Sequence, residues 1–248
     1  MKFINSLMAT IMFFKSGFTN TMNPKDFYDD AKEIRLLKAV RRGNTNEIKR
    51  LVQDHNVNVN AQGHEGMRPI FWAMGNESKE GLRTLLELGA DPNVQAPGLG
   101  APLHLAAVAT DSEYLKILLE HNANPNIKNN AGDPVTAPII RQRRWENLKL
   151  WLDHGGDINI TNAANETPIR HAAVLNQYEQ VAYLIERGAD FRIPARSGGT
   201  VAHIIHTRRV SSKLPAYQWQ QKVREMLIER GVEFPPPTPR EIRKQWEK

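Results

Sequence analysis

Turn residues recur along this chain at a fixed interval of 33 positions. The stretch that begins at Leu85 reads L-L-E-L-G-A-D-P-N, and closely similar stretches follow in which Gly or Asn holds the turn position. Residues at that position, each 33 after the one before, are Asn56, Gly89, Asn122, Gly155 and Gly188. A last copy has Gly231, 43 positions after Gly188. Such a period predicts a chain made of stacked copies of one small structural unit.

The beginnings of the units share a second pattern. The segment from Ala101 reads A-P-L-H-L-A-A, and the segment from Thr167 reads T-P-I-R-H-A-A. A Thr can cap a helix, and a Pro at the first helical position loses no hydrogen bond. Leu115 and Leu118 have helical spacing and predict a second helix with one buried face. Gly or Asn in the turn supplies the left-handed residue that ends this helix.

Together the two patterns resemble the ankyrin repeat, with its T-P-L-H-x-A-A opening and its L-L-x-x-G-A-D-x-N close. The resemblance covers about 33–234 and implies an all-α fold, an ankyrin-repeat solenoid of about six helix-turn-helix units with short hairpin tips and helical caps. The expected repeat domain is 24–234, with units near 33–65, 66–99, 100–131, 132–165, 166–198 and 199–234. Residues that define the repeat are Pro102, His104, Pro168, Gly89, Gly155 and Gly188.

Both ends of the array depart from the repeat. A charged helix over 26–42 is expected as the N-terminal cap. Ten extra residues in the sixth unit are expected at 208–215, as a loop between its two helices. In 235–248 a Pro-rich linker precedes a capping box and a short helix, whose Ile242 and Trp246 share one face. That face is either a lid on the last unit or a handle for a partner.

The fourth unit is degenerate. Pro138 falls inside its expected first helix, which should therefore start late or be deformed. Arg and Trp are enriched among binding hot spots, and this unit continues with Arg141, Arg143, Arg144 and Trp145. We interpret these four residues as a candidate contact site. The alternative is that Trp145 packs over the weak unit and that the arginines are solvated.

In ankyrin proteins, partners usually lie against the hairpin tips and the exposed side of the first helices. Carried over by position, this implies first-helix candidates at Trp72, Asn76, Leu105, Ala109, Arg141, His171 and Leu175. The corresponding tip candidates are Gln95, Asn129, Asn162 and Arg196. Large apolar side chains on an open face would be unusual unless something covers them, so some of these residues could instead lie beneath a neighbouring hairpin.

Catalytic chemistry is not expected. The chain has no cysteine, and it contains no nucleophile elbow, phosphate-binding loop or zinc-protease motif. His104 and His203 stand at the ankyrin histidine position, which implies a structural role. We therefore expect no catalytic residue, no metal site and no cofactor. An enzyme would require a pocket with convergent acid and base groups between units four and six.

The charge and the N-terminus bear on partners and location. The net charge is +6, but Lys and Arg are spread over the chain, so no nucleic-acid partner is expected. Residues 1–22 are signal-like or disordered, and their apolar run 3–14 is too short to span a bilayer. Membrane association is expected only through this segment. If it targets the chain, the protein is periplasmic or associated with the inner membrane; a start at Met22 would leave it cytoplasmic.

A short, free-standing array behind a signal-like segment resembles the ankyrin-repeat immunity proteins of bacteria, which are encoded beside toxins such as the lipase effectors of type VI secretion. The resemblance implies a monomer that binds a cognate toxin and occludes its active site. The alternative is a scaffold, or a secreted effector that binds a host protein.

Overall fold

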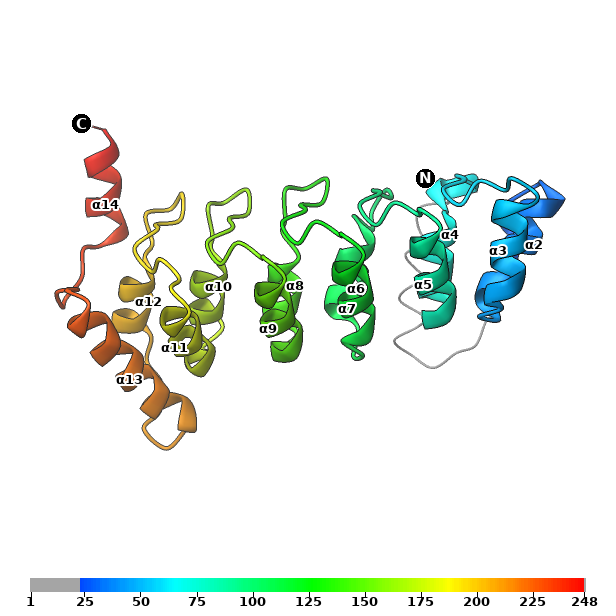
Figure 1. The fold of residues 1–248 in the computed structure, drawn as a ribbon. Coiled ribbons are helices and arrows are strands. Elements are labelled where there is room, and N and C mark those ends of the chain that lie inside the picture. Colours follow the sequence, from blue (N-terminus) through cyan, green and yellow to red (C-terminus); the bar gives the residue numbers. More distant parts are fainter. Residues whose placement is uncertain (1–22, 248) are drawn as a thin grey trace. The chain divides into compact units, whose positions relative to one another are not determined.

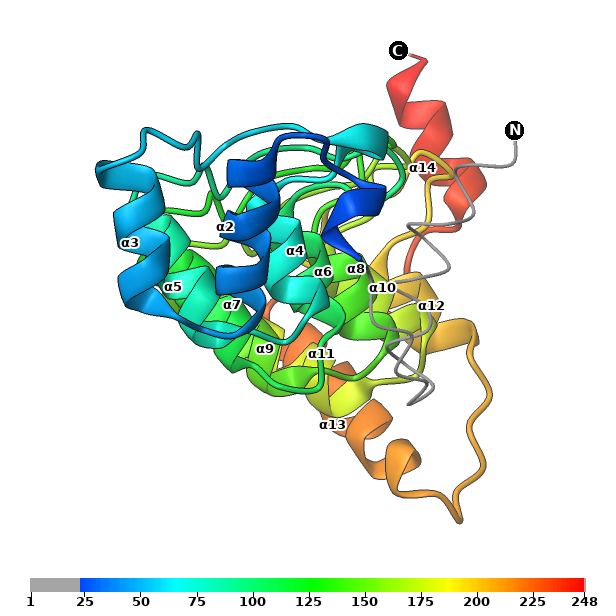
Figure 2. The same cartoon turned by 90° about the vertical axis from the view of Figure 1, so that its right-hand side faces the viewer.

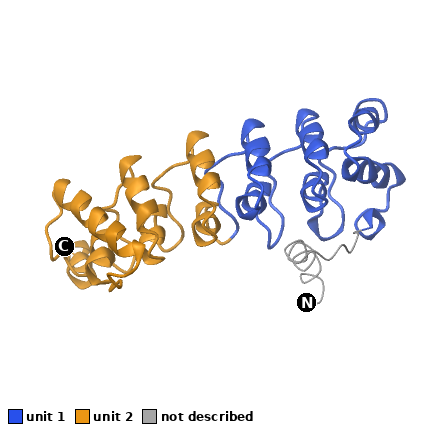
Figure 3. Cartoon of the chain, turned by 90° about the horizontal axis from the view of Figure 1, so that it is seen from below, with its two compact units in different colours: residues 1–130 blue, residues 131–248 orange. Residues whose placement is uncertain are grey.

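The computed structural model describes residues 23–247, and every regular element in this range is a helix (Figure 1). The prediction of an all-α fold is confirmed. Besides the helices there is one isolated antiparallel bridge, between Ala96 and Gly100. The chain divides into two compact units, residues 1–130 and 131–248, which are coloured separately in Figure 3. The signal-like segment 1–22 lies outside the described residues.

The first unit contains three helix pairs behind a short 3-10 helix, and successive pairs lie side by side (Figure 1). Its elements are η1 (Pro24–Asp26), α2 (Ala31–Arg41), α3 (Thr45–Gln53), η2 (His64–Gly66), α4 (Pro69–Gly75), α5 (Lys79–Glu87), α6 (Pro102–Val108) and α7 (Glu113–Glu120).

The second unit contains three further pairs and a terminal helix. Its elements are α8 (Thr136–Arg141), α9 (Trp145–Asp153), α10 (Pro168–Val174), α11 (Tyr178–Glu186), α12 (Val201–Thr207), α13 (Pro215–Glu229) and α14 (Pro239–Trp246). Helix α11 packs against both α10 and α13, so neighbouring pairs share one core.

The recurring turn residues take the left-handed conformation that the sequence pattern predicts. Gly89 has φ 90° and Gly188 has φ 89°, while Asn56 and Asn122 have φ 54° and 64° at the equivalent positions. Each of these residues ends the second helix of its pair. Only Gly, and to a lesser extent Asn, adopts this region at little cost.

The helices form their core as the repeat requires. Thr167 and Thr200 cap α10 and α12, because each side-chain oxygen accepts a hydrogen bond from the backbone N–H three residues on. Leu115 and Leu118 on α7 are fully buried. The paired alanines at the close-packed positions of the first helices are also fully buried: Ala106, Ala107, Ala172 and Ala173.

The N-terminal cap differs from the prediction of one helix over 26–42. Helix α2 begins only at Ala31, because the Asp30 carboxylate accepts hydrogen bonds from the N–H groups of Lys32 and Glu33. Before it, Phe27 and Tyr28 turn inward and are buried. A helix through these residues would have left both rings on a charged, solvated face.

The segment 24–29 packs against the first hairpin. The Tyr28 hydroxyl lies 2.9 Å from the carbonyl oxygens of both Ala61 and Met67. Gly63 is required beneath it, since a Cβ there would collide with the Phe27 carbonyl and the Tyr28 ring. The cap is therefore a folded plug followed by a helix.

In the fourth pair, Pro138 has the predicted effect. Helix α8 has six residues, where α4, α6 and α10 have seven, and its N-cap residue Val135 makes no capping hydrogen bond through its side chain. Trp145 does not belong to this helix. It is the first residue of α9, because Arg143 takes φ 55° and turns the chain there, as Asn176 does in the next pair.

The ten-residue insertion is not only a loop. The connection from α12 to α13 has seven residues, 208–214, where that from α10 to α11 has three. Helix α13 has fifteen residues, where α11 has nine, so the larger part of the insertion lengthens the helix. Pro215 favours a helix start, and no further Pro or Gly occurs before Gly231. The loop projects from α12 and α13 (Figure 2).

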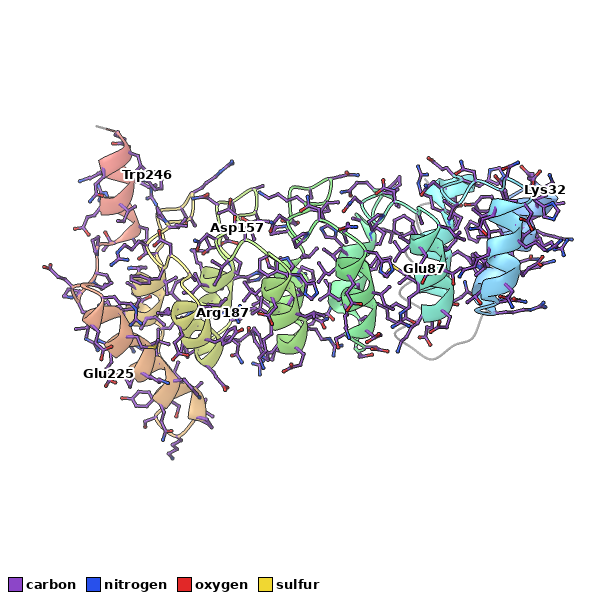
Figure 4. The ribbon with its side chains drawn as sticks, in the orientation of Figure 1. Lys32, Glu87, Asp157, Arg187, Glu225 and Trp246 are labelled. Atoms are coloured by element: carbon purple, nitrogen blue, oxygen red, sulfur yellow. The ribbon has the colours of Figure 1, made fainter. Side chains whose placement is uncertain are left out.

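Helix α14 touches the hairpin tip before α12 through its N-terminal part. The Arg243 guanidinium donates to the Ser197 carbonyl, and the Pro239 carbonyl lies against Gly198. Thr238 and Glu241 form the predicted capping box. Trp246, near the C-terminal end, is 51% exposed (Figure 4). The predicted apolar lid is therefore incomplete, and polar and backbone contacts hold the helix.

Candidate protein-binding surface

Asparagine side chains tie successive hairpins together in the first unit. The Asn60 side-chain oxygen accepts a 2.8 Å hydrogen bond from the Asp91 N–H, and its amide donates to the Gly89 carbonyl. Asn93, 33 positions later, accepts a 2.7 Å bond from the Asn124 N–H. Each Asn therefore fixes the start of the next hairpin. This Asn belongs to the repeat motif, but its role in joining hairpins was not predicted.

The second unit repeats this arrangement and orders its tips. Asn159 accepts a 2.8 Å hydrogen bond from the Asp190 N–H. At the tip, the Asn162 side-chain oxygen accepts from the N–H groups of Ala164 and Glu166. The Arg196 N–H donates to the Ala164 carbonyl, which joins adjacent tips and leaves the Arg196 side chain exposed. Of these tip candidates, Asn162 is thus a positioning residue and Arg196 is accessible.

Trp72 cannot contact a partner, contrary to our expectation. Its side chain is fully buried, and its indole nitrogen donates a 2.7 Å hydrogen bond to the Leu37 carbonyl. The Phe27 ring meets its edge at 6.1 Å between centroids. The N-terminal plug thus covers the position that later repeats leave more open. Asn76 is half-buried, and its amide donates back to the Trp72 carbonyl.

The remaining candidates of the first unit are accessible to different degrees. Leu105 and Ala109, at the exposed side of α6, are half-buried. Gln95 is exposed, and its amide donates to the Lys128 carbonyl. Asn129 is half-buried. These residues leave a small and mostly apolar face on α6.

In the second unit, α8 and α10 present the other first-helix candidates. Arg141 is exposed at the end of α8, while His171 and Leu175 on α10 are half-buried. Burial lowers the pKa of His171; the positive charges of Arg141 and Arg170 lower it further, and Glu166 and Asp133 oppose the shift. His171 is therefore favoured in its neutral form, which can both donate and accept a hydrogen bond. The face combines one cation, one neutral imidazole and one apolar side chain.

Arg141, Arg143, Arg144 and Trp145 lie on different elements of the fourth pair. Arg141 ends the first helix, Arg143 lies exposed in the left-handed turn, and Trp145 starts the second helix, where it is half-buried. Arg144 is also half-buried, at the N-cap of α9. Only Arg141 therefore belongs to the first-helix face.

Arg170 is a structural residue that sequence analysis did not single out. It stands 66 positions after His104, at the ankyrin histidine position. The His104 ring nitrogen Nδ1 accepts a hydrogen bond from the Ala101 N–H. Arg170 reaches farther: its Nε donates a 3.1 Å bond to the Gly199 carbonyl in the next hairpin, and it forms an ion pair with Glu166. The Arg at position 170, where the repeat has His, was the sequence feature that could have indicated this role.

A pocket of about 230 Å³ lies in the second unit, where the insertion meets α12 and α13. The insertion was predicted from the repeat spacing, but the pocket was not. It is lined by Ile205, His206, Arg208, Arg209, Val210, Tyr217, Gln220, Gln221 and Arg224. Seven of these nine residues are basic or polar, and none is acidic.

Two further features are absent from residues 23–247. No group of three or more His, Asp or Glu side chains in this range is placed to hold a metal ion. None of the helices in the same range is long and apolar enough to cross a membrane.

Comparison with known proteins places these features in context. Residues 9–96 and 103–195 match a family model described as ankyrin repeats (3 copies). No curated protein matches the chain. The crystal structure of EF0377, an ankyrin repeat protein, is similar with a TM-score of 0.63 and 26% identity, over 79% of this chain and 96% of that one. The ankyrin repeat domain of Bcl-3, a member of the IkappaB family, is 20% identical with a TM-score of 0.67, over 84% of this chain and 92% of its own.

Proposed function

The chain belongs to the ankyrin-repeat family, and on this premise we propose that it is an immunity protein, which neutralises a cognate bacterial toxin by binding to it. Ankyrin repeats indicate a protein-binding module, and the toxin is the specific partner that we propose. A lipase effector of the type VI secretion system is the class of toxin that we favour.

The first-helix face of α8 and α10 is the observation that carries this proposal. Arg141 is exposed there beside half-buried His171 and Leu175, and the hairpin tips that flank the face are held by backbone and Asn hydrogen bonds. A surface ordered before binding loses little conformational entropy when a partner docks. The net charge of +6 would speed the encounter with an acidic patch on the toxin.

Inhibition by occlusion requires no reactive group on this chain. A bound protein that covers the entrance of a hydrolase active site excludes the substrate sterically. Arg141 would pair with a carboxylate of the toxin, and the neutral His171 ring would hydrogen-bond at the rim of the contact. Both residues would then act by binding alone.

A growth competition tests this function. We expect a lipase-like toxin to be encoded beside this protein, and cells that carry this toxin should survive with the wild-type chain and be lost when the chain is deleted. Arg141→Glu should reduce survival by at least about tenfold, since one reversed charge in a contact costs on the order of 1.4 kcal/mol or more. Arg240→Glu on α14 makes the same charge change away from this face and should protect normally.

The alternative function, a scaffold or a secreted effector that binds a host protein, makes the opposite predictions. The chain itself would then be secreted, and its deletion would leave the producing cells as resistant as before. If the protein also failed to co-purify with a toxin, the immunity proposal would be wrong.

The proposed location follows from the same function. A toxin that attacks the cell envelope would be met in the periplasm or at the inner membrane, and residues 1–22 would then target the chain there. Translation from Met22 would instead give a cytoplasmic protein. Cell fractionation of a C-terminally tagged chain distinguishes the two, and mass spectrometry of its N-terminus identifies the start.

A further inference from the structure

The pocket of the sixth pair is a product of the insertion. Its walls are the end of α12, the connection 208–214 and the N-terminal part of α13. Gln220 on α13 is buried, and its amide donates to the carbonyl oxygens of Ile205 and Arg208. These two bonds attach the start of the connection to α13, so the pocket has an ordered base.

The charge of this pocket is positive and uncompensated. Arg208, Arg209 and Arg224 line it together with His206, and no carboxylate does. Among residues 23–247, none of the three arginines forms an ion pair. The Arg208 guanidinium donates to the Val174 carbonyl, and Arg224 lies over the Phe234 ring at 4.9 Å. Arg209 makes neither kind of contact and is exposed.

Like charges gathered without acidic partners repel one another, so their presence in a pocket favours a bound anion. The guanidinium group has a planar fork of N–H donors that matches a carboxylate in two parallel hydrogen bonds. Tyr217 and Gln221 add a hydroxyl and an amide to the same walls. Ile205 and Val210 supply apolar surface beside these groups.

The backbone around the pocket suits a carboxylate better than a phosphate. Phosphate sites in proteins are commonly formed by free N–H groups at a helix N-terminus. Here α12 reaches the pocket with its C-terminal end, whose groups are carbonyls, and the Tyr217 N–H is bonded to the Leu214 carbonyl at 2.9 Å. The anion would therefore be held by side chains, and these are mixed with apolar surface.

We propose that this pocket, which we call the insertion pocket, binds an acidic peptide segment of the protein partner. Carboxylates of the segment pair with Arg209 and Arg224, and an adjoining apolar side chain rests against Val210 and Tyr217. The proposal rests on the protein-binding function above and adds a second anchor, separate from the first-helix face of α8 and α10. Its chemistry does not depend on the partner being a toxin.

The test measures binding of a fluorescein-labelled octapeptide of alternating Glu and Leu to the full chain by fluorescence anisotropy. The same peptide with Gln in place of Glu is the probe control. The Glu peptide should bind at least about tenfold more tightly than the Gln peptide, and its affinity should fall as the salt concentration rises, because the contact is ionic. The double variant Arg209→Gln/Arg224→Gln should bind it at least about tenfold more weakly than the wild type does.

A matched variant separates the pocket from overall charge. Arg42→Gln/Arg240→Gln removes the same two charges from exposed positions outside the pocket and should keep the wild-type affinity within about twofold. Thermal unfolding should show both double variants folded. If the pocket variant did unfold, the single variant Arg209→Gln, which changes an exposed side chain without a contact, carries the test.

Three results would overturn the inference. The first is equal affinity of the wild type for the Glu and Gln peptides, and the second is equal affinity of the pocket variant and the wild type for the Glu peptide. The third is stabilisation of the wild type by inorganic phosphate in thermal unfolding when the Glu peptide does not bind. The last would identify a phosphate site. These results leave the proposed function untouched, since the growth competition tests that function through Arg141. If the growth competition failed but the Glu peptide bound, the toxin would be excluded as the partner and the proposal for the insertion pocket would stand.

Discussion

The indole nitrogen of Trp72 donates a 2.7 Å hydrogen bond to the carbonyl oxygen of Leu37, and no part of the Trp72 side chain is exposed. This bond joins the first helix of the second pair to the first helix of the pair before it. A residue that looked like a binding anchor is therefore part of the core of the first unit.

Trp72→Ala should destabilise the protein by about 3–5 kcal/mol, because it removes a buried ring, leaves a cavity and deprives the Leu37 carbonyl of its donor. Urea unfolding followed by circular dichroism measures the change. Trp246→Ala, at a half-exposed position, should cost less than about 1 kcal/mol. A Trp72→Ala protein that kept its stability and lost only partner binding would contradict this assignment.

Asn93→Ala should cost about 1–3 kcal/mol, since the Asn124 N–H would lose the acceptor 2.7 Å away. Hydrogen exchange of the Asn124 backbone N–H should also increase, because this group would lose its hydrogen-bond acceptor. Asn46→Ala removes an exposed amide from α3 and serves as the control, with a change within about 0.5 kcal/mol. Equal stability of the two variants would mean that the Asn contact between hairpins adds nothing.

A substitution at Gly188 should change stability only through the backbone conformation, and not through a clash of the new side chain. Its φ is 89°, and a Cβ would meet no atom within 4 Å. Gly188→Asn should cost less than about 1 kcal/mol, because Asn56 and Asn122 already occupy the equivalent turns, while Gly188→Val should cost about 1–2 kcal/mol more. Thermal unfolding of both variants decides it. If Val were tolerated as well as Asn, the left-handed turn would not limit this site.

Stability should fall as the solution is acidified below about pH 6.5. Burial, together with the positive charges of Arg141 and Arg170, lowers the pKa of His171 from 6.5 in spite of Glu166 and Asp133, and burial and His206 lower that of His203. On acidification the unfolded chain therefore binds protons before the folded chain does. The stabilisation that the two neutral histidines provide above pH 6.5 is lost as the pH falls toward their folded-state pKa values, and below those values their effect on stability levels off.

The variants His171→Gln and His203→Gln test this sign. Each should flatten the fall in unfolding free energy between pH 7 and about pH 5, and the double variant should flatten it most. Unfolding in urea at several pH values measures the slope. A slope unchanged in the double variant would show that other groups set the acid sensitivity.

Much of the fold could be predicted because local residue types mark the helix boundaries in each repeat. Gly or Asn at the turn and Thr or Pro at a helix start act within a few residues, so their effect is visible in sequence. The short helix α8, which begins at Thr136 and contains Pro138, was predicted on the same basis. The N-terminal plug could not be predicted in this way, because Phe27 and Tyr28 are fixed by contacts with residues 61–72, distant in sequence.

The candidate surface was harder to predict than the fold. The repeat pattern gives the position of a residue on its helix, but burial depends on what covers that helix. Trp72, Leu105 and His171 occupy equivalent positions, yet only Trp72 is fully buried, since only it lies beneath the plug. The insertion pocket was missed because its lining is shared by α12, the connection and α13, which the repeat period does not bring together.

Residues 24–29 precede the first helix pair, yet they help to close the interior of the first hairpin, because Gly63 faces Phe27 and Tyr28 directly. Anyone who shortens this chain for crystallisation or for a fusion protein therefore cannot use the repeat pattern to choose the cut. A version that opened at Ala31 would keep all six helix pairs, but the hydroxyl that bridges Ala61 and Met67 would be gone and the indole of Trp72 would meet water.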